Sequence, residues 1–129
     1  MQTQKLLIVD DEIDVCDFVK NFFEERGLKV LAALNGAEAV SIFQKERPDL
    51  ILLDIKMKGL DGIATLRQIR EIDNAAKVIM VTALHDQDRL EESYKYGAID
   101  YITKPLILDN LEEAVAKNLG SREDRAETI

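Results

Sequence analysis

Cysteine, histidine and proline are almost absent from this chain, which has one Cys, one His and two Pro among its 129 residues. The single cysteine, Cys16, excludes an intramolecular disulfide framework. With one histidine beside it, the sequence also excludes a zinc site built from Cys and His ligands. The first apolar run, Leu6–Val9, is too short for a secretory signal, which needs about 7–15 apolar residues, or for a transmembrane helix, which needs about 20. We therefore expect a cytoplasmic protein that makes no membrane contact.

Positive charge is also scarce, because 17 Lys and Arg stand against 25 Asp and Glu and leave a net charge of −8. This balance argues against binding to nucleic acid or to an anionic membrane, since both require clustered Lys and Arg. Apolar residues make up 47% of the chain, which is enough for a packed core and excludes general disorder. The length fits one ordinary domain, which we place at residues 1–120, followed by a polar tail or linker start at 121–129.

Five short apolar runs recur at intervals of roughly 20–28 residues, the spacing of βα repeats in a parallel sheet. The first four runs are almost continuous rather than alternating, which predicts strands buried on both faces. The runs are Leu6–Val9, Val30–Leu34, Leu50–Leu53, Val78–Val81 and Ala98–Ile102.

Segments with helical periodicity separate these runs. The first has apolar residues at the i, i+3, i+4, i+7, i+8 spacing of a helix face: Val15, Phe18, Val19, Phe22 and Phe23. The others are predicted after Asn35, around Ile63–Ile69, from Asp86 or Asp88 to Gly97, and from about Asp109 to Leu119. Five strands that alternate with five helices predict an α/β fold with right-handed crossovers.

The residues that can carry chemistry directly follow the apolar runs. Asp10 and Asp11 follow the first run, Asp54 the third, Thr82 the fourth and Lys104 the fifth. Ligands of open α/β sheets bind at the carboxyl ends of the strands, so we expect these side chains at one edge. Clustered carboxylates are unfavourable without a cation among them, and their hard oxygens suit Mg²⁺. A lysine and a hydroxyl beside that cation favour a phosphoryl group, with a carboxylate as its acceptor.

Five short motifs occur in an order and at spacings that point to a known family. They are Val9-Asp10-Asp11-Glu12, Leu53-Asp54, Asp61-Gly62, Val81-Thr82-Ala83 and Tyr101-x-x-Lys104-Pro105. Over about residues 5–119 the sequence therefore resembles the response regulator receiver domains of two-component signalling. The resemblance implies a flavodoxin-like (βα)5 doubly wound parallel sheet with strand order 2-1-3-4-5. It also implies a phosphoacceptor signalling domain rather than a conventional enzyme, one that catalyses its own phosphorylation and dephosphorylation.

The resemblance assigns the acceptor and the metal ligands. Asp54 would take the phosphoryl group, in a Mg²⁺-dependent transfer from a phosphohistidine. Asp10 and Asp11 would form the acidic pair around the metal. Asp11, Asp54 and the backbone carbonyl of Lys56 would be its direct ligands.

The resemblance also assigns the switch and the partners. Thr82 and Lys104 would bind the phosphoryl oxygens, and Tyr101 would change rotamer on activation. The peptide bond before Pro105 is usually cis in this family. A sensor histidine kinase or a phosphotransfer protein would be the donor. The face made by the fourth helix, fifth strand and fifth helix would then respond, with a homodimer as one outcome.

Two alternative functions compete with a receiver domain. A Mg²⁺-dependent phosphohydrolase of the haloacid dehalogenase type also uses an Asp after a strand, but it usually has Asp-x-Asp, and Lys56 occupies that second position. A flavin- or nucleotide-binding module would place a glycine-rich loop after the first strand, where this chain has the acidic Asp10 and Asp11.

One residue departs from the family pattern. Lys58 lies in the loop after Asp54, at a position where the family usually has proline. Proline would restrict φ there, so the sequence predicts a less rigid loop and an altered partner surface, with the chemistry retained.

Overall fold

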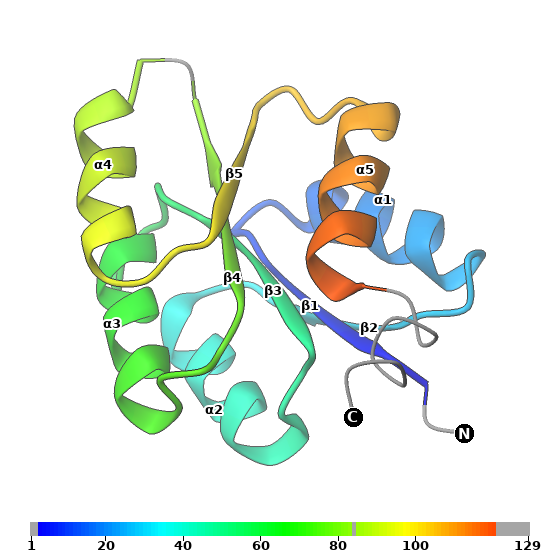
Figure 1. Ribbon diagram of the computed structural model, residues 1–129, viewed down its shortest axis with the longest axis horizontal. Helices are drawn as coiled ribbons and strands as arrows, with labels where there is room; N and C mark the ends of the chain where they lie inside the picture. Colours follow the sequence, from blue (N-terminus) through cyan, green and yellow to red (C-terminus); the bar gives the residue numbers. More distant parts are fainter. Residues whose placement is uncertain (1–2, 84, 121–129) are drawn as a thin grey trace.

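The computed structural model describes residues 3–83 and 85–120. Five parallel strands form one sheet in the order β2-β1-β3-β4-β5, and a helix follows each strand (Figure 1). The strands are β1 (Lys5–Val9), β2 (Lys29–Ala33), β3 (Leu50–Asp54), β4 (Val78–Thr82) and β5 (Asp100–Thr103). The helices are α1 (Ile13–Glu24), α2 (Gly36–Glu46), α3 (Gly62–Ile72), α4 (Gln87–Lys95) and α5 (Leu108–Leu119). The predicted fold class and strand order are confirmed, and the predicted tail at 121–129 lies outside the described residues.

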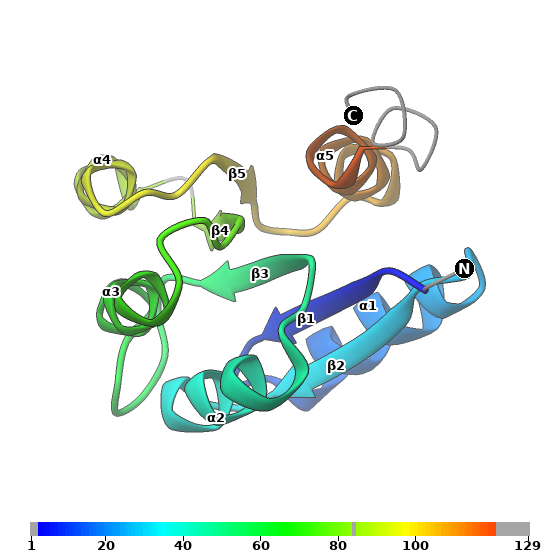
Figure 2. The same cartoon turned by 60° about the horizontal axis from the view of Figure 1, so that its bottom comes forward.

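The sheet separates two apolar clusters because successive strand residues point to opposite faces. In β1, Leu7 and Val9 pack on the side of α2, α3 and α4, whereas Leu6 and Ile8 pack on the side of α1 and α5. Figures 1 and 2 show α3 and α4 together on one side of the sheet and α1 and α5 together on the other. Within the described residues, no helix is long and apolar enough to cross a bilayer.

The strand order reverses between β1 and β3, and this reversal positions the site. β1 pairs with β2 on one side and with β3 on the other, both in parallel register. The chain leaves β1 toward α1 and leaves β3 toward α3, which cover opposite faces of the sheet. The two loops therefore diverge, and the carboxyl ends of β1 and β3 remain accessible at the topological switch point.

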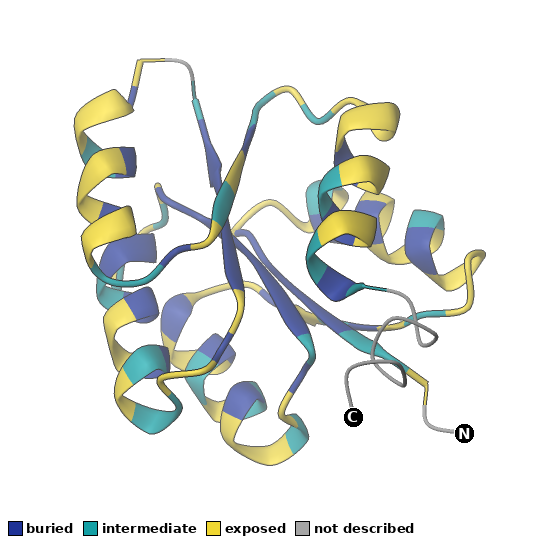
Figure 3. Cartoon of the chain, in the orientation of Figure 1, coloured by how far each residue is buried: buried dark blue, intermediate teal, exposed yellow. Residues whose placement is uncertain are grey.

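One prediction about burial is wrong, and the apolar face of the first helix is only partly buried. The second run was expected to be buried on both faces, but β2 is an edge strand, and Ala32 and Leu34 are exposed. Figure 3 shows that the central strands β3 and β4 are mostly buried. In α1 the buried residues are Cys16, Val19 and Phe23, whereas Phe18 is 41% exposed. An edge strand is paired with another strand on one side only, so part of it stays exposed. On the first helix, the stripe of residues that is buried against the sheet is narrower than the stripe of apolar residues in the sequence.

The boundaries around β5 also differ from the prediction. The fifth run was expected to form a strand from Ala98, but β5 begins at Asp100. The Ala98 amide donates to the Ser93 carbonyl, and Gly97 has a φ of +99°. Residues 97 and 98 therefore complete the carboxyl-terminal cap of α4, and the Ile99 amide is the first to donate to β4, at the Val78 carbonyl.

Candidate functional site

Three carboxylates meet at the carboxyl ends of β1 and β3. Oxygen atoms of Asp10, Asp11 and Asp54 all lie within 4.8 Å of one another. Asp10 is fully buried and Asp54 is 5% exposed, whereas Asp11 faces solvent. The Asp10 Oδ1 accepts from the Glu12 amide at 2.9 Å, and the Asp54 Oδ1 accepts from the Lys56 amide at 3.2 Å. The predicted acidic cluster is therefore assembled by the two strand ends and held by the backbone of their own loops.

Lys104 brings a positive charge to two of these carboxylates. Its ammonium lies 2.9 Å from the Asp10 Oδ2 and 3.0 Å from the Asp54 Oδ2. The Lys104 amide donates to the Thr82 carbonyl at 2.8 Å, which fixes the end of β5 beside β4. The peptide bond to Pro105 is cis. The lysine thus reaches the site from the fifth strand, at the sheet edge where the sequence predicts it.

The buried carboxylates and the ammonium alter each other's protonation. Burial raises the pKa of Asp54 to about 6; the hydrogen bond from Lys104 opposes this rise, and the charge on Asp10 adds to it. Burial alone would lower the pKa of Lys104, but the hydrogen bonds and charges of Asp10 and Asp54 outweigh it and raise that pKa. The ammonium is therefore kept charged, and the site has an excess of negative charge once Asp54 ionises.

Thr82 and Tyr101, the two residues expected to form the switch, lie on the neighbouring strands β4 and β5. Thr82 is 3% exposed at the end of β4, and its hydroxyl donates to the Ala83 carbonyl at 3.1 Å. Tyr101 lies on β5 and is 44% exposed. In this structure the hydroxyl expected to move is therefore bonded to the backbone of the next residue, and the ring expected to move is largely exposed.

A family model described as the response regulator receiver domain matches residues 6–116, which are almost all of the described chain. The chain belongs to the response regulator receiver domain family. Receiver domains are the phosphoacceptor signalling domains of two-component response regulators. The haloacid dehalogenase alternative has no support from this match, and Lys56 remains at the position where that chemistry usually has a second Asp.

Relatives of this receiver domain agree with the family match over nearly their whole length. Sporulation initiation phosphotransferase F of Bacillus subtilis is 40% identical over 119 residues, which are 92% of this chain and 96% of that protein. The chemotaxis protein CheY of the same organism is 38% identical over 116 residues, covering 89% of this chain and 97% of that protein. The crystal structure of a response regulator receiver domain protein from Methanospirillum hungatei has a TM-score of 0.89 at 29% identity, covering 96% of this chain and 99% of that chain.

Receiver domains bind Mg²⁺, and the acidic cluster of this receiver domain fits that ion. Its donors are hard carboxylate oxygens, the ligands that Mg²⁺ prefers. The buried Asp10 Oδ2 has the Lys104 ammonium as its neighbour, 2.9 Å away, and that ammonium is shared with the Asp54 Oδ2. A single ammonium does not balance three carboxylates. The cluster is therefore best neutralised by a divalent cation.

Magnesium should stabilise the receiver domain through this cluster. Because the ion binds the folded chain, it should add about 1.4 kcal/mol to the free energy of unfolding when the Mg²⁺ concentration is ten times the dissociation constant. Thermal melts with and without Mg²⁺ measure this gain, and Asp11→Ala should remove it. Coincident wild-type melts, or an undiminished gain in Asp11→Ala, would contradict the metal assignment.

The raised pKa of Asp54 predicts an unusual dependence of stability on pH. Because the folded protein binds the Asp54 proton more tightly than the unfolded chain, whose pKa is near 3.8, stability falls as the pH rises from about 4 to about 6. Asp54→Asn has no such carboxyl group, so its unfolding free energy should not show this fall. The unfolding free energy of the variant minus that of wild type should therefore increase by about 2 kcal/mol between about pH 4 and about pH 6 and then stay constant. Urea unfolding of both proteins at several pH values without divalent ions measures the difference. A difference independent of pH would show that burial does not control this carboxylate.

Sequence reasoning missed a set of ion pairs next to the site. The Lys56 ammonium lies 3.5 Å from the Asp86 Oδ1, and an Arg89 guanidinium nitrogen lies 2.7 Å from the Asp61 Oδ2. Both pairs join the β3–α3 loop to the start of α4. The sequence shows that the two loops carry opposite charges. Which of these charges pair depends on the orientation of α4, and the periodicity of the sequence does not predict that orientation. Lys58, the departure from the family pattern, is exposed in the same loop.

Proposed function

We propose that Asp54 is the phosphoacceptor of this receiver domain and that a phosphohistidine is the donor. The observation that carries the proposal is the position of the Asp54 carboxylate, buried between the Lys104 ammonium and two further carboxylates at the switch point of the sheet. Asp54 is the carboxylate whose pKa is raised by burial while a lysine holds it in place. With a pKa of about 6, such a carboxylate is mostly ionised at neutral pH and can act as a nucleophile.

In the proposed transfer, a carboxylate oxygen of Asp54 attacks the phosphorus of the donor. An O–P bond forms, the N–P bond breaks, and the bonding electron pair returns to the donor imidazole. Magnesium held by Asp11, Asp54 and the Lys56 carbonyl, with Asp10 in support, would supply charge neutralisation for the transferring group. The acyl phosphate that results is opened again by water, which makes the modification reversible.

Lys104 and Thr82 bind the phosphoryl oxygens in this proposal. The Lys104 ammonium already lies 3.0 Å from the carboxylate that becomes phosphorylated. The Thr82 hydroxyl would exchange its bond to the Ala83 carbonyl for a bond to a phosphoryl oxygen, which is a stronger, charged acceptor. Phosphoryl transfer depends chiefly on positioning and charge neutralisation, so these two groups and the metal are sufficient.

A sensor histidine kinase or a phosphotransfer protein is the proposed donor. The surface next to the site supports a protein donor, because the exposed Phe18 of α1 lines a pocket together with Lys104, Pro105 and Leu106. Apolar side chains gathered beside a reactive carboxylate are suited to a partner that must bring its phosphohistidine to Asp54. The proposed donor obtains its phosphoryl group from ATP, which is available in the cytoplasm. The proposed location of this receiver domain is therefore the cytoplasm.

The response is proposed to reach the face made by α4, β5 and α5. Movement of Thr82 toward a phosphoryl group opens space beside β5, and the Tyr101 ring, exposed on that strand, turns inward to fill it. Binding of beryllofluoride, a phosphoryl mimic, should then shift amide resonances across residues 85–105 and promote self-association detected by light scattering. Shifts confined to the neighbours of Asp54 would contradict this switch, and shifts without self-association would reject the homodimer alone.

Intact-mass measurement tests the proposed function directly. With Mg²⁺ and acetyl phosphate, a small phosphodonor, the wild-type chain should gain one phosphoryl group that is lost on standing, and Asp54→Asn should gain none. Asp14→Asn, an exposed carboxylate on α1, is the matched control and should behave as wild type. Equal labelling of Asp54→Asn and wild type would reject the assignment.

A further inference from the structure

α4 is held to the domain by few apolar contacts. Of its nine residues, Leu90 and Ser93 are buried, whereas α3, with eleven residues, buries five. The carboxyl-terminal end of α4 is fixed by Tyr96, whose ring stacks under the Arg67 guanidinium of α3 at 4.7 Å. The amino-terminal end has no such aromatic contact within the described residues. The polar contacts at that end are therefore important for its attachment.

Two ion pairs of opposite polarity join this end of α4 to the loop that follows the phosphoacceptor. The loop offers a cation, Lys56, to Asp86 at the N-cap position of α4, and an anion, Asp61, to Arg89 in its first turn. Asp61 is held rigidly, because its other carboxylate oxygen accepts from the Ala64 amide at the start of α3. Reversed polarity means that only one register of α4 against the loop satisfies both pairs.

A hydrogen-bonded turn connects these pairs to Thr82. The Ala83 carbonyl accepts both the Thr82 hydroxyl and the Asp86 amide, each at 3.1 Å. When the Thr82 hydroxyl leaves this carbonyl for a phosphoryl oxygen, the turn that places Asp86 opposite Lys56 loses one of its two bonds. The turn is thus a route by which a rearrangement of Thr82 would reach the start of α4.

We propose that the Lys56–Asp86 and Asp61–Arg89 pairs form an ionic latch that holds α4 in its unphosphorylated position. The inference rests on the proposed phosphoacceptor role of Asp54 and names a regulatory device of that site. A latch made only in the unphosphorylated state opposes phosphorylation. By linkage, weakening the latch must tighten the binding of any group that favours the phosphorylated state.

Beryllofluoride affinity, measured by titrating amide resonances in the presence of Mg²⁺, tests the latch. Arg89→Gln removes one pair without touching a residue of the phosphoacceptor site, and it should tighten beryllofluoride binding by about two- to five-fold, the range for a partly exposed ion pair. The same variant should speed amide hydrogen exchange in residues 87–91 of the free protein. Arg89→Lys retains the charge, so its beryllofluoride affinity should lie between those of Arg89→Gln and wild type. A loss of side-chain packing alone would not produce this difference between the lysine and glutamine variants.

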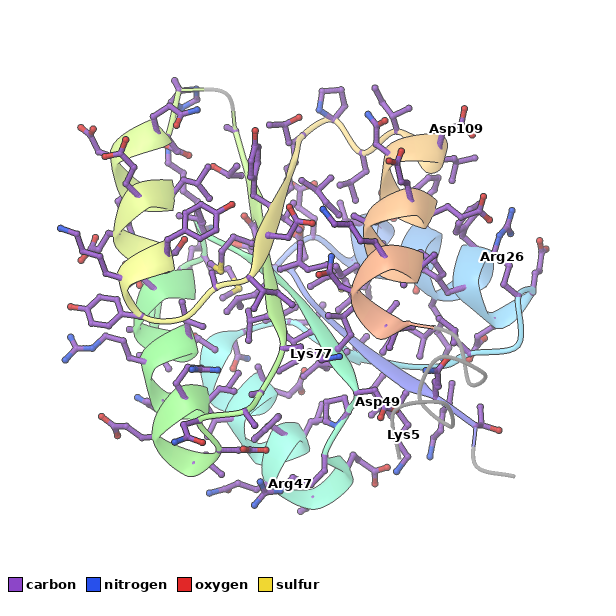
Figure 4. All side chains as sticks on the ribbon, in the orientation of Figure 1. Lys5, Arg26, Arg47, Asp49, Lys77 and Asp109 are labelled. Carbon is purple, nitrogen blue, oxygen red and sulfur yellow. The ribbon has the colours of Figure 1, made fainter. Side chains whose placement is uncertain are left out.

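Arg26→Gln is the matched control. Arg26 pairs with Glu112 at similar exposure, and Figure 4 shows it at the end of α1, on the far side of the molecule from α4. Its loss should leave beryllofluoride affinity unchanged. Equal affinity of Arg89→Gln and wild type, or equal tightening by Arg26→Gln, overturns the latch alone. A wild-type protein that does not bind beryllofluoride overturns the proposed function, and the latch with it.

Discussion

Replacing Lys104 with methionine is expected to slow phosphorylation of Asp54 by acetyl phosphate by on the order of 100-fold, the typical loss when one charge-stabilising donor is removed. Methionine retains much of the side-chain length and removes the ammonium that lies 2.9 Å from Asp10 and 3.0 Å from Asp54. Without that cation the pKa of Asp54 rises further, because the hydrogen bond that opposes the effect of burial is lost. The midpoint of the pH–rate profile should therefore move to higher pH as the plateau rate falls.

Lys58→Met is the control for this experiment. Lys58 is an exposed lysine in the loop that follows Asp54. Its replacement removes one positive charge near the site, as Lys104→Met does, but leaves the contacts of Lys104 with the acidic cluster in place. Its rate should stay within about two-fold of wild type, since exposed charges are screened. Similar losses in the two variants would mean that general positive charge, rather than the contact made by Lys104, supports the reaction.

Replacing Gly62 with alanine is expected to cost about 3 kcal/mol of unfolding free energy and to displace the loop that follows Asp54. A Cβ at this position would lie 2.1 Å from the Asp54 carbonyl oxygen and 2.7 Å from the Ile55 Cα. Both neighbours are backbone atoms, so no flexible side chain can move aside. The Gly62 amide also donates to the Ile55 carbonyl at 2.9 Å, which connects the start of α3 to the residue after Asp54.

Gly59→Ala separates this clash from the general effect of losing a glycine. Gly59 lies in the same loop with a φ of +78°, but a Cβ there would meet no atom within 4 Å. Its cost should be limited to the left-handed conformation, about 1 kcal/mol. Chemical denaturation of the two variants measures the difference. A Gly62→Ala protein as stable as Gly59→Ala would show that the loop adjusts freely around Asp54.

The strands that carry the site were predictable from the sequence because they are central. β1, β3 and β4 are covered on both faces and flanked on both edges, so their residues form continuous apolar runs that end at Asp10, Asp54 and Thr82. β2 has an almost equally apolar run, yet it is an edge strand with Ala32 exposed. Local composition does not distinguish these two situations, and the strand order came from family resemblance rather than from periodicity.

The contacts between loops were not predictable for a different physical reason. The positions of Asp10, Asp54 and Lys104 follow from strand ends, which parallel pairing brings to one edge. The Asp61–Arg89 and Lys56–Asp86 pairs depend instead on the angle at which α4 packs, and that angle is set by the few buried residues of the helix. The hydroxyl of Thr82 illustrates the same limit, because its rotamer is decided by a single hydrogen bond to Ala83.

Borohydride trapping of the acyl phosphate tests the central claim most directly. Hydride reduces a phosphorylated aspartate to homoserine and releases phosphate, so peptide mass mapping after treatment with acetyl phosphate and Mg²⁺ identifies the residue that was modified. The account predicts homoserine at position 54 and unmodified aspartate at positions 10 and 11. Homoserine at Asp10 or Asp11, or no homoserine in a protein that has gained a phosphoryl group, would contradict it.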